Sequence, residues 1–286
     1  MKTLNLVIYF LLALVIAFAL SIYFHYRIGE VSVTDPFIPE ILEEPVKRPV
    51  VRYPVPDTLS IPEPSIIEPP QSEKTEEQND TDPLAGLPEN LPTIEDSDTL
   101  VNQALVGLLT GRASTDLIIV DSFIQRLVLT INNLPEKKLP LAHVPFELPE
   151  GNFVTVGGED DLRISPENYQ RYTPYLDLLE NINPDSVIRT YVYLYPLLQT
   201  AYRQLGYPTA YFNDRLVYVI EHLLETPNPD DPLPLAQPSV LYTYASPGLE
   251  ELSAGQKVLL RMGKEQRSRV KSVLRNYHFR LTRLLP

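Results

Sequence analysis

The 286-residue chain contains no cysteine. This absence excludes disulfide bonds, thiolate nucleophiles and thiolate metal sites together. The four histidines, at positions 25, 143, 222 and 278, show no metal-ligand spacing. The sequence GGEDD at 157–161 lacks the spaced oxygen ligands of a calcium loop and is predicted to be a turn. Because phosphate-cradling loops and nucleophile elbows are also missing, we predict no metal, no cofactor, no nucleic-acid partner and no identifiable catalytic residue.

Charge of one sign is concentrated in a single segment. Residues 30–98 carry 17 acidic and 4 basic side chains, a net charge of −13, which equals the net charge of the whole chain. The rest of the sequence is therefore neutral in sum. The acidic pI describes a segment and gives no argument for an acidic catalytic surface.

Only one long apolar run occurs, LVIYFLLALVIAFALSIYF at residues 6–24, and it contains no charge. As a helix it would span about 29 Å, close to the ~30 Å hydrocarbon core of a bilayer. A signal peptide cleaved near the small-x-small sequence at 17–19 is the alternative. The run continues beyond that site and ends in aromatic residues, which favours a retained anchor.

The anchor sets the expected location. A short amino-terminal tail that stays in the cytoplasm is the commoner outcome for one anchor at the extreme amino terminus, although basic residues stand on both sides of the span. We therefore expect residues 1–29 to cross the inner membrane of a bacterium, with the lipid bilayer as a partner and the folded domain in the periplasm.

The segment from 30 to 92 is rich in proline and glutamate. Of the 29 prolines, 13 lie between Pro36 and Pro92. Such composition predicts an extended, disordered linker without a packed core. It would act as a spacer through the cell envelope, with docking of a Pro-rich partner as a second use.

From residue 93 to the end, helical periodicity dominates. Capping residues or helix-starting prolines predict where the helices begin; the predicted starts are Ser97, Ser114, Ser165, Thr173, Asn183, Thr209, Ser253 and Lys264. Alternation predicts two short strands, at 151–158 and 239–244, which can pair as one ribbon. The predicted fold is mainly α, with about seven helices around one core and one small two-stranded β-ribbon.

Asn213, Asp214 and Arg215 lie side by side where an apolar helix begins. Because apolar residues recur at three- and four-residue spacings from 212 to 223, the helix must include 212, which predicts Thr209 as its cap. Adjacent helical residues do not face each other, so Asp214 and Arg215 are not expected to pair. Asp214 complements the positive end of the helix dipole, and Arg215 can stack on the tyrosine at i−4 or i+3.

A structural network at this position is favoured over a catalytic one, because ion pairs with perturbed pKa values occur in both. The binding interpretation joins the same three residues to Arg171 and Tyr172. Ten tyrosines between 169 and 218 allow an aromatic ligand platform, but their helical spacing favours core packing.

The closing helix, from Lys264, is strongly basic. It carries seven basic side chains against one acidic side chain, beside an apolar stripe. We name Arg267, Lys271 and Arg275 as its basic face, which is either solvated surface or a docking surface for anionic lipid or an acidic protein.

Four stretches resemble a known family: RYTPYL, YPLLQTAYRQLGYP, YFNDRLV and GQKVLLRMG. The chain from about residue 91 onward is similar to domain of unknown function 3014, an uncharacterised bacterial family. The resemblance implies an amino-terminal anchor and a Pro-rich spacer. It implies no activity, cofactor or functional residue.

Two functions remain open. The first is a non-enzymatic envelope protein whose tethered helical domain binds a protein or a cell-wall component. The second is an enzyme acting on cell-wall or lipid-linked material through carboxylates such as Asp214, with Arg171 and Arg215. An enzyme needs these side chains to converge in one concave pocket. The sequence favours the first function.

Overall fold

The computed structural model describes residues 51–56, 83–109, 115–158 and 161–284. The chain divides into two units, Met1–Lys47 and Arg48–Pro286, and every described residue belongs to the second. The predicted membrane span at 6–24 lies outside the described residues. Within the described ranges, no helix is both long enough and apolar enough to cross a membrane.

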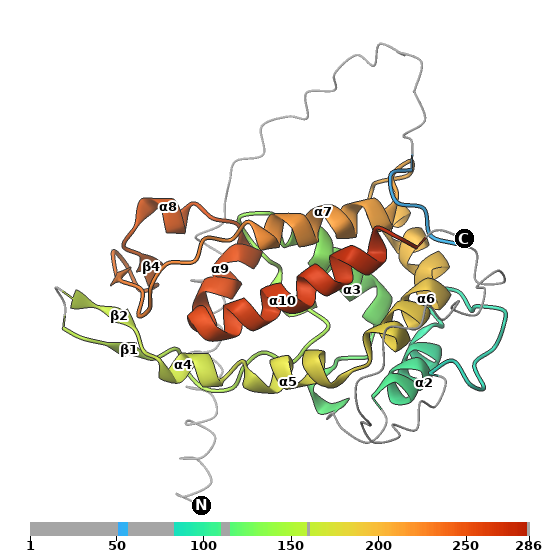
Figure 1. The fold of residues 1–286 in the computed structure, drawn as a ribbon, viewed down its shortest axis with the longest axis horizontal. Helices are drawn as coiled ribbons and strands as arrows, with labels where there is room; N and C mark the ends of the chain where they lie inside the picture. Colours follow the sequence, from blue (N-terminus) through green and yellow to red (C-terminus); the bar gives the residue numbers. More distant parts are fainter. Residues whose placement is uncertain (1–50, 57–82, 110–114, 159–160, 285–286) are drawn as a thin grey trace, which may run out of the picture. The chain divides into compact units, whose positions relative to one another are not determined.

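The described residues form nine α-helices and two small antiparallel sheets (Figure 1), so the predicted mainly helical fold is confirmed. Seven helices have eight residues or more, and α4 and α8 have four. The α-helices are α2 Asp98–Leu108, α3 Phe123–Asn133, α4 Glu167–Gln170, α5 Thr173–Asn181, α6 Pro184–Gln204, α7 Phe212–Leu224, α8 Pro247–Glu250, α9 Ala254–Arg261 and α10 Gly263–Leu281. Short 3-10 helices occupy Thr115–Leu117 and Leu141–His143.

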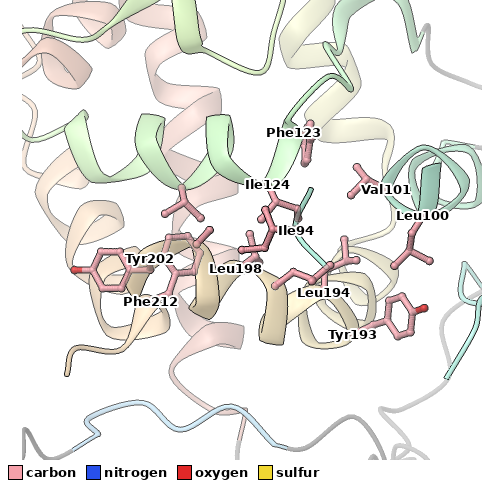
Figure 2. Close-up of a cluster of buried hydrophobic side chains, with 13 residues drawn as sticks. Ile94, Leu100, Val101, Phe123, Ile124, Tyr193, Leu194, Leu198, Tyr202 and Phe212 are labelled. Atoms are coloured by element: carbon pink, nitrogen blue, oxygen red, sulfur yellow. The ribbon is translucent and has the colours of Figure 1, made fainter. Parts of the chain in front are cut away.

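The main core lies between α2, α3, α6 and the start of α7, as Figure 2 shows. The long helix α6 contacts α2, α3, α7 and α10, which fits its predicted central position. Helix α7 packs against α10, and α10 also packs on α5 and α9. Smaller apolar clusters under α10 share residues with the main core.

The prediction of a single β-ribbon was wrong. Strand β1, Thr155–Val156, pairs with β2, Arg163–Ile164, and strand β3, Leu235–Ala236, pairs with β4, Thr243–Tyr244. Each predicted strand therefore pairs with a close sequence neighbour, and the neighbouring strands are too short to show alternation. Backbone hydrogen bonds of 3.0 Å and 2.7 Å, from Ile164 to Leu233 and from Leu235 to Leu162, join the two hairpins.

Two predicted helix starts were also wrong. Helix α3 begins at Phe123, because the Asp98 carboxylate accepts hydrogen bonds from the backbone N–H groups of Ser122 and Phe123, at 2.8 and 3.3 Å. Helix α7 begins at Phe212, with Tyr211 and not Thr209 as its cap.

Two other predicted caps are confirmed. The Asn183 side chain accepts a hydrogen bond from the backbone N–H of Asp185, at the start of α6. Ser253 and Gln256 form a capping box at the start of α9.

Two stretches of the predicted linker contact the helical domain. Residues 83–92 bring leucines onto the main core, and the Tyr193 phenol donates a hydrogen bond of 2.6 Å to the Pro88 carbonyl. Residues 51–56 contact α7 and α10 through Tyr53. Apolar side chains within this Pro-rich sequence account for both contacts, because the transfer of apolar surface out of water is favourable. The rest of the predicted linker lies outside the described residues.

Candidate functional site

Asn213 is fully buried at the start of α7 and joins three other segments. Its side-chain amide donates to the carbonyl of Tyr53 at 2.9 Å and to the carbonyl of Leu281, at the end of α10, at 3.4 Å. Its side-chain oxygen accepts a hydrogen bond of 2.9 Å from the Tyr191 phenol of α6. Burial, together with the nearby Tyr195 and Asp214, raises the pKa of Tyr191, so this phenol stays a donor. The amide thus holds four segments together.

Asp214 binds the docked linker segment directly. Its two carboxylate oxygens accept hydrogen bonds from the backbone N–H groups of Arg52, at 3.0 Å, and Tyr53, at 2.8 Å. The Tyr53 ring packs beside the apolar cluster of Val217, Ile220 and Leu281. Because each oxygen already accepts a backbone hydrogen bond, this carboxylate has a structural role: it links the start of α7 to residues 52–53.

Arg215 points to a third place. Its guanidinium donates to the Asn132 carbonyl near the end of α3 at 2.6 Å and lies 3.7 Å from the Glu136 carboxylate. The predicted stacking on the tyrosine at i+3 is confirmed, since the guanidinium carbon lies 5.2 Å from the centre of the Tyr218 ring. A cation at a helix carboxyl terminus is also favoured by the helix dipole.

Arg171 and Tyr172 lie elsewhere, at the turn between α4 and α5. The Arg171 guanidinium donates to the carbonyls of Pro149, Glu150 and Gly151, at 2.9, 2.8 and 2.7 Å. These partners are neutral, so the guanidinium is satisfied in hydrogen bonding without a carboxylate. Together with Tyr172 it lines a cleft that none of the residues 213–215 reaches. The structure therefore divides the predicted binding residues into two groups.

That cleft has a volume of about 380 Å³ and lies beside the β-hairpins, α8 and α9. This volume is within the range of about 300–1,000 Å³ typical of small-molecule sites. Most of its wall is aromatic or aliphatic, and its polar groups are two guanidiniums, one carboxylate and several hydroxyls. The lining residues are Phe153, Ile164, Arg171, Tyr172, Leu235, Leu241, Tyr242, Thr243, Tyr244, Glu250 and Arg261.

The electrostatics of the cleft are positive. Its one carboxylate, Glu250, is paired with Lys257 at 2.9 Å and accepts a hydrogen bond from the backbone N–H of Tyr244. Burial works to raise the pKa of Glu250, but these contacts outweigh it and the net shift is downward, so this carboxyl stays ionised. Burial also raises the pKa of Tyr172, against the charges of Arg261 and Arg171, so this phenol keeps its proton.

The residues named as a basic face are placed differently from one another. Arg267 is fully buried and Lys271 is nearly so, while Arg275 is exposed. The Arg267 guanidinium donates to the Pro229 carbonyl at 3.0 Å, and the Lys271 ammonium donates to the Thr226 carbonyl. These two side chains hold the segment after α7 and do not face solvent.

Three further basic residues of α10 are paired with acidic residues of other segments. Lys264 pairs with Asp230 at 2.7 Å, and Arg269 pairs with Glu180 at 2.6 Å. Arg280 forms an ion pair with Asp185. Most of the positive charge counted in the sequence is therefore buried or neutralised within the domain.

The described residues contain no group of three or more His, Asp or Glu side chains placed to hold a metal ion. Two histidines each make one side-chain hydrogen bond: His222 lies 2.9 Å from the Ser253 hydroxyl and His278 lies 2.9 Å from the Glu221 carboxylate. The GGEDD sequence falls between β1 and β2, with its residues 159–160 outside the described ranges.

Sequence reasoning did not identify the partners of these residues. The docking of Tyr53 depends on hydrogen bonds over 160 residues of sequence separation, and no local pattern predicts them. Arg261 and Tyr242 were within predicted elements, but nothing in the sequence placed them beside Tyr172. The one available signal was the exposed apolar pair Val240 and Leu241, which alternation assigned to a strand.

Comparison with family models assigns the chain to a family. Residues 123–278 match the family described as a protein of unknown function, DUF3014, over more than half of the chain. The chain belongs to this family, as the resemblance predicted. No curated protein and no solved structure matches it.

The stretches that resemble the family have structural roles in this fold. In YPLLQTAYRQLGYP, the Gln199 side chain accepts from the backbone N–H of Phe212 at 2.9 Å and donates to the Ala210 carbonyl at 2.8 Å, which fixes the start of α7. In GQKVLLRMG, the backbone N–H of Gly255 donates to the Leu134 carbonyl at 2.9 Å, and a Cβ there would lie 2.9 Å from that oxygen. Only glycine allows this close approach.

Proposed function

We propose that this protein is a non-enzymatic binding module of the bacterial cell envelope, tethered to the inner membrane with its helical domain in the periplasm. The observation that carries the proposal is the position of Asp214. This carboxylate is the example named for the enzyme alternative, and its two oxygens accept hydrogen bonds from the backbone N–H groups of Arg52 and Tyr53. Arg171 lines a separate cleft, so the side chains named for catalysis do not converge.

The docked segment shortens the proposed tether. If the apolar run at 6–24 spans the membrane and residues 51–56 stay on the domain, only residues 25–50 separate the two. The proposed tether is therefore shorter than the predicted linker at 30–92.

Protease added to spheroplasts tests the location. The proposed orientation predicts that external protease removes the helical domain from intact spheroplasts, because the domain lies outside the inner membrane. A cytoplasmic marker protein that survives the same treatment is the control. Protection of the domain until the cells are lysed would contradict the proposal.

A further inference from the structure

The cleft beside the β-hairpins contains two guanidiniums, those of Arg171 and Arg261, and neither forms an ion pair in the described part of the chain. Arg261, at the end of α9, is exposed and forms no ion pair there. Its charge acts on the Tyr172 phenol and on the Glu250 carboxylate, and its guanidinium is hydrogen-bonded to the Tyr244 phenol; all three groups line the same cleft. Most other basic residues of α9 and α10 are buried or paired, whereas Arg261, like Arg275, is exposed.

Arg171 adds to this positive charge. All five of its hydrogen bonds go to neutral oxygens, those of residues 149–152 and the side-chain oxygen of Asn168. A guanidinium held in this way is oriented without being neutralised. The only carboxylate of the lining, Glu250, is paired with Lys257 and also lies in the field of Arg261. An anion entering the cleft therefore meets two guanidiniums against one carboxylate that Lys257 already pairs.

Apolar side chains surround the same opening. Leu241 is 74% exposed and the adjoining Val240 is 88% exposed. The Tyr242 and Phe153 rings, with centres 5.9 Å apart, form part of the wall. Exposed apolar groups around a charged cleft are typical of surfaces that bind a partner.

We propose that this cleft binds a polypeptide segment that carries a carboxylate flanked by apolar residues. The carboxylate lies against Arg261 and the Tyr172 hydroxyl, and the flanking residues cover Leu241, Tyr242 and Phe153. A polypeptide fits better than a small anion because the exposed apolar residues extend beyond the cleft itself. This inference deepens the proposed binding function and depends on it.

Binding of a matched pair of peptides to the full-length chain in lipid nanodiscs tests the inference. The first peptide is Ac-Val-Ile-Glu-Val-Leu-amide, and the second replaces Glu by Gln and so removes only the charge. We expect the Glu peptide to bind about tenfold more tightly, because a charge-assisted hydrogen bond contributes roughly that factor. Its affinity should fall as salt is raised. Empty nanodiscs correct for binding to lipid.

Three variants test whether the peptides bind in this cleft. Arg261→Gln should remove about the same tenfold preference, and Tyr242→Ala should weaken both peptides. Arg203→Gln is the matched control, since Arg203 is exposed, lies in α6 and loses the same charge away from the cleft. Three results would overturn the inference: equal binding of the two peptides, an equal effect of the Arg203 and Arg261 changes, or a preference for anionic vesicles over both peptides. None of them would change the outcome of the spheroplast experiment. Failure of this inference can therefore be told apart from failure of the proposed function.

Discussion

At the start of α7, three successive side chains contact three different parts of the molecule. Asn213 contacts Tyr53, α6 and α10, while Asp214 holds the backbone of residues 52–53. Arg215 contacts the end of α3. Successive positions on a helix point about 100° apart, so a run of three polar residues can join three neighbours without forming one site. This arrangement explains why the sequence resembles an active site.

Replacement of Asp214 by alanine tests this role. We expect Asp214→Ala to lower the free energy of unfolding by about 1–3 kcal/mol, because the backbone amides of Arg52 and Tyr53 lose a charged acceptor. Urea denaturation measures the change. Glu95→Ala, a change of an exposed acidic residue before α2, is the control. Loss of cellular function with unchanged stability would instead support the enzyme alternative.

Part of this residue-scale role could be predicted. The sequence placed Asp214 and Arg215 in the first turn of a helix, excluded their mutual pairing and predicted the stacking on Tyr218. The carboxylate's partners could not be predicted, because they lie 161 and 162 residues away in the chain. The burial of Arg267 and Lys271 could not be predicted either, since long cationic side chains usually lie at the surface.

Among the elements, the junction between α9 and α10 depends on one glycine. Gly263 has a φ of +79°, and a Cβ built there would lie 2.7 Å from the Tyr169 ring. Left-handed backbone costs other residues roughly 1–2 kcal/mol, and the ring leaves no room for a side chain. The angle between the two helices thus requires glycine at this position.

We expect Gly263→Ala to destabilise the domain by at least about 1–2 kcal/mol in urea denaturation, because the strain of a positive φ is added to the clash with Tyr169. Gly248→Ala is the matched control. Gly248 lies in α8 with a negative or extended φ, and its nearest neighbour to a new Cβ is the Ser246 hydroxyl at 3.9 Å. An equal effect of the two substitutions would show that the junction does not need glycine.

The elements themselves were predicted where local signals were strong. A capping residue followed by proline gave the start of α6, and a capping box gave the start of α9. Helix α3 starts later than its periodicity indicated, because the Asp98 carboxylate of another helix caps it. One strand of each hairpin was predicted, but the partner strands β2 and β3 were missed, because two residues are too few to show alternation.

For the whole molecule, the central question is where the tether ends and the domain begins. Composition assigned residues 30–92 to the linker, since prolines and acidic residues outnumber apolar ones there. Docking of 51–56 rests on a few apolar residues and on hydrogen bonds to a distant helix. The composition of the whole 30–92 segment cannot predict contacts that involve so few of its residues.

Hydrogen exchange of the Arg52 and Tyr53 amides in the full-length chain tests this claim most directly. Both N–H groups donate to Asp214, so we predict slow exchange in the wild type and much faster exchange in Asp214→Ala. The amide of Val128, a buried residue in the middle of α3, should stay protected in both forms and serves as the control. Fast exchange of residues 52 and 53 in the wild type, at the rate of an unstructured peptide, would contradict the account.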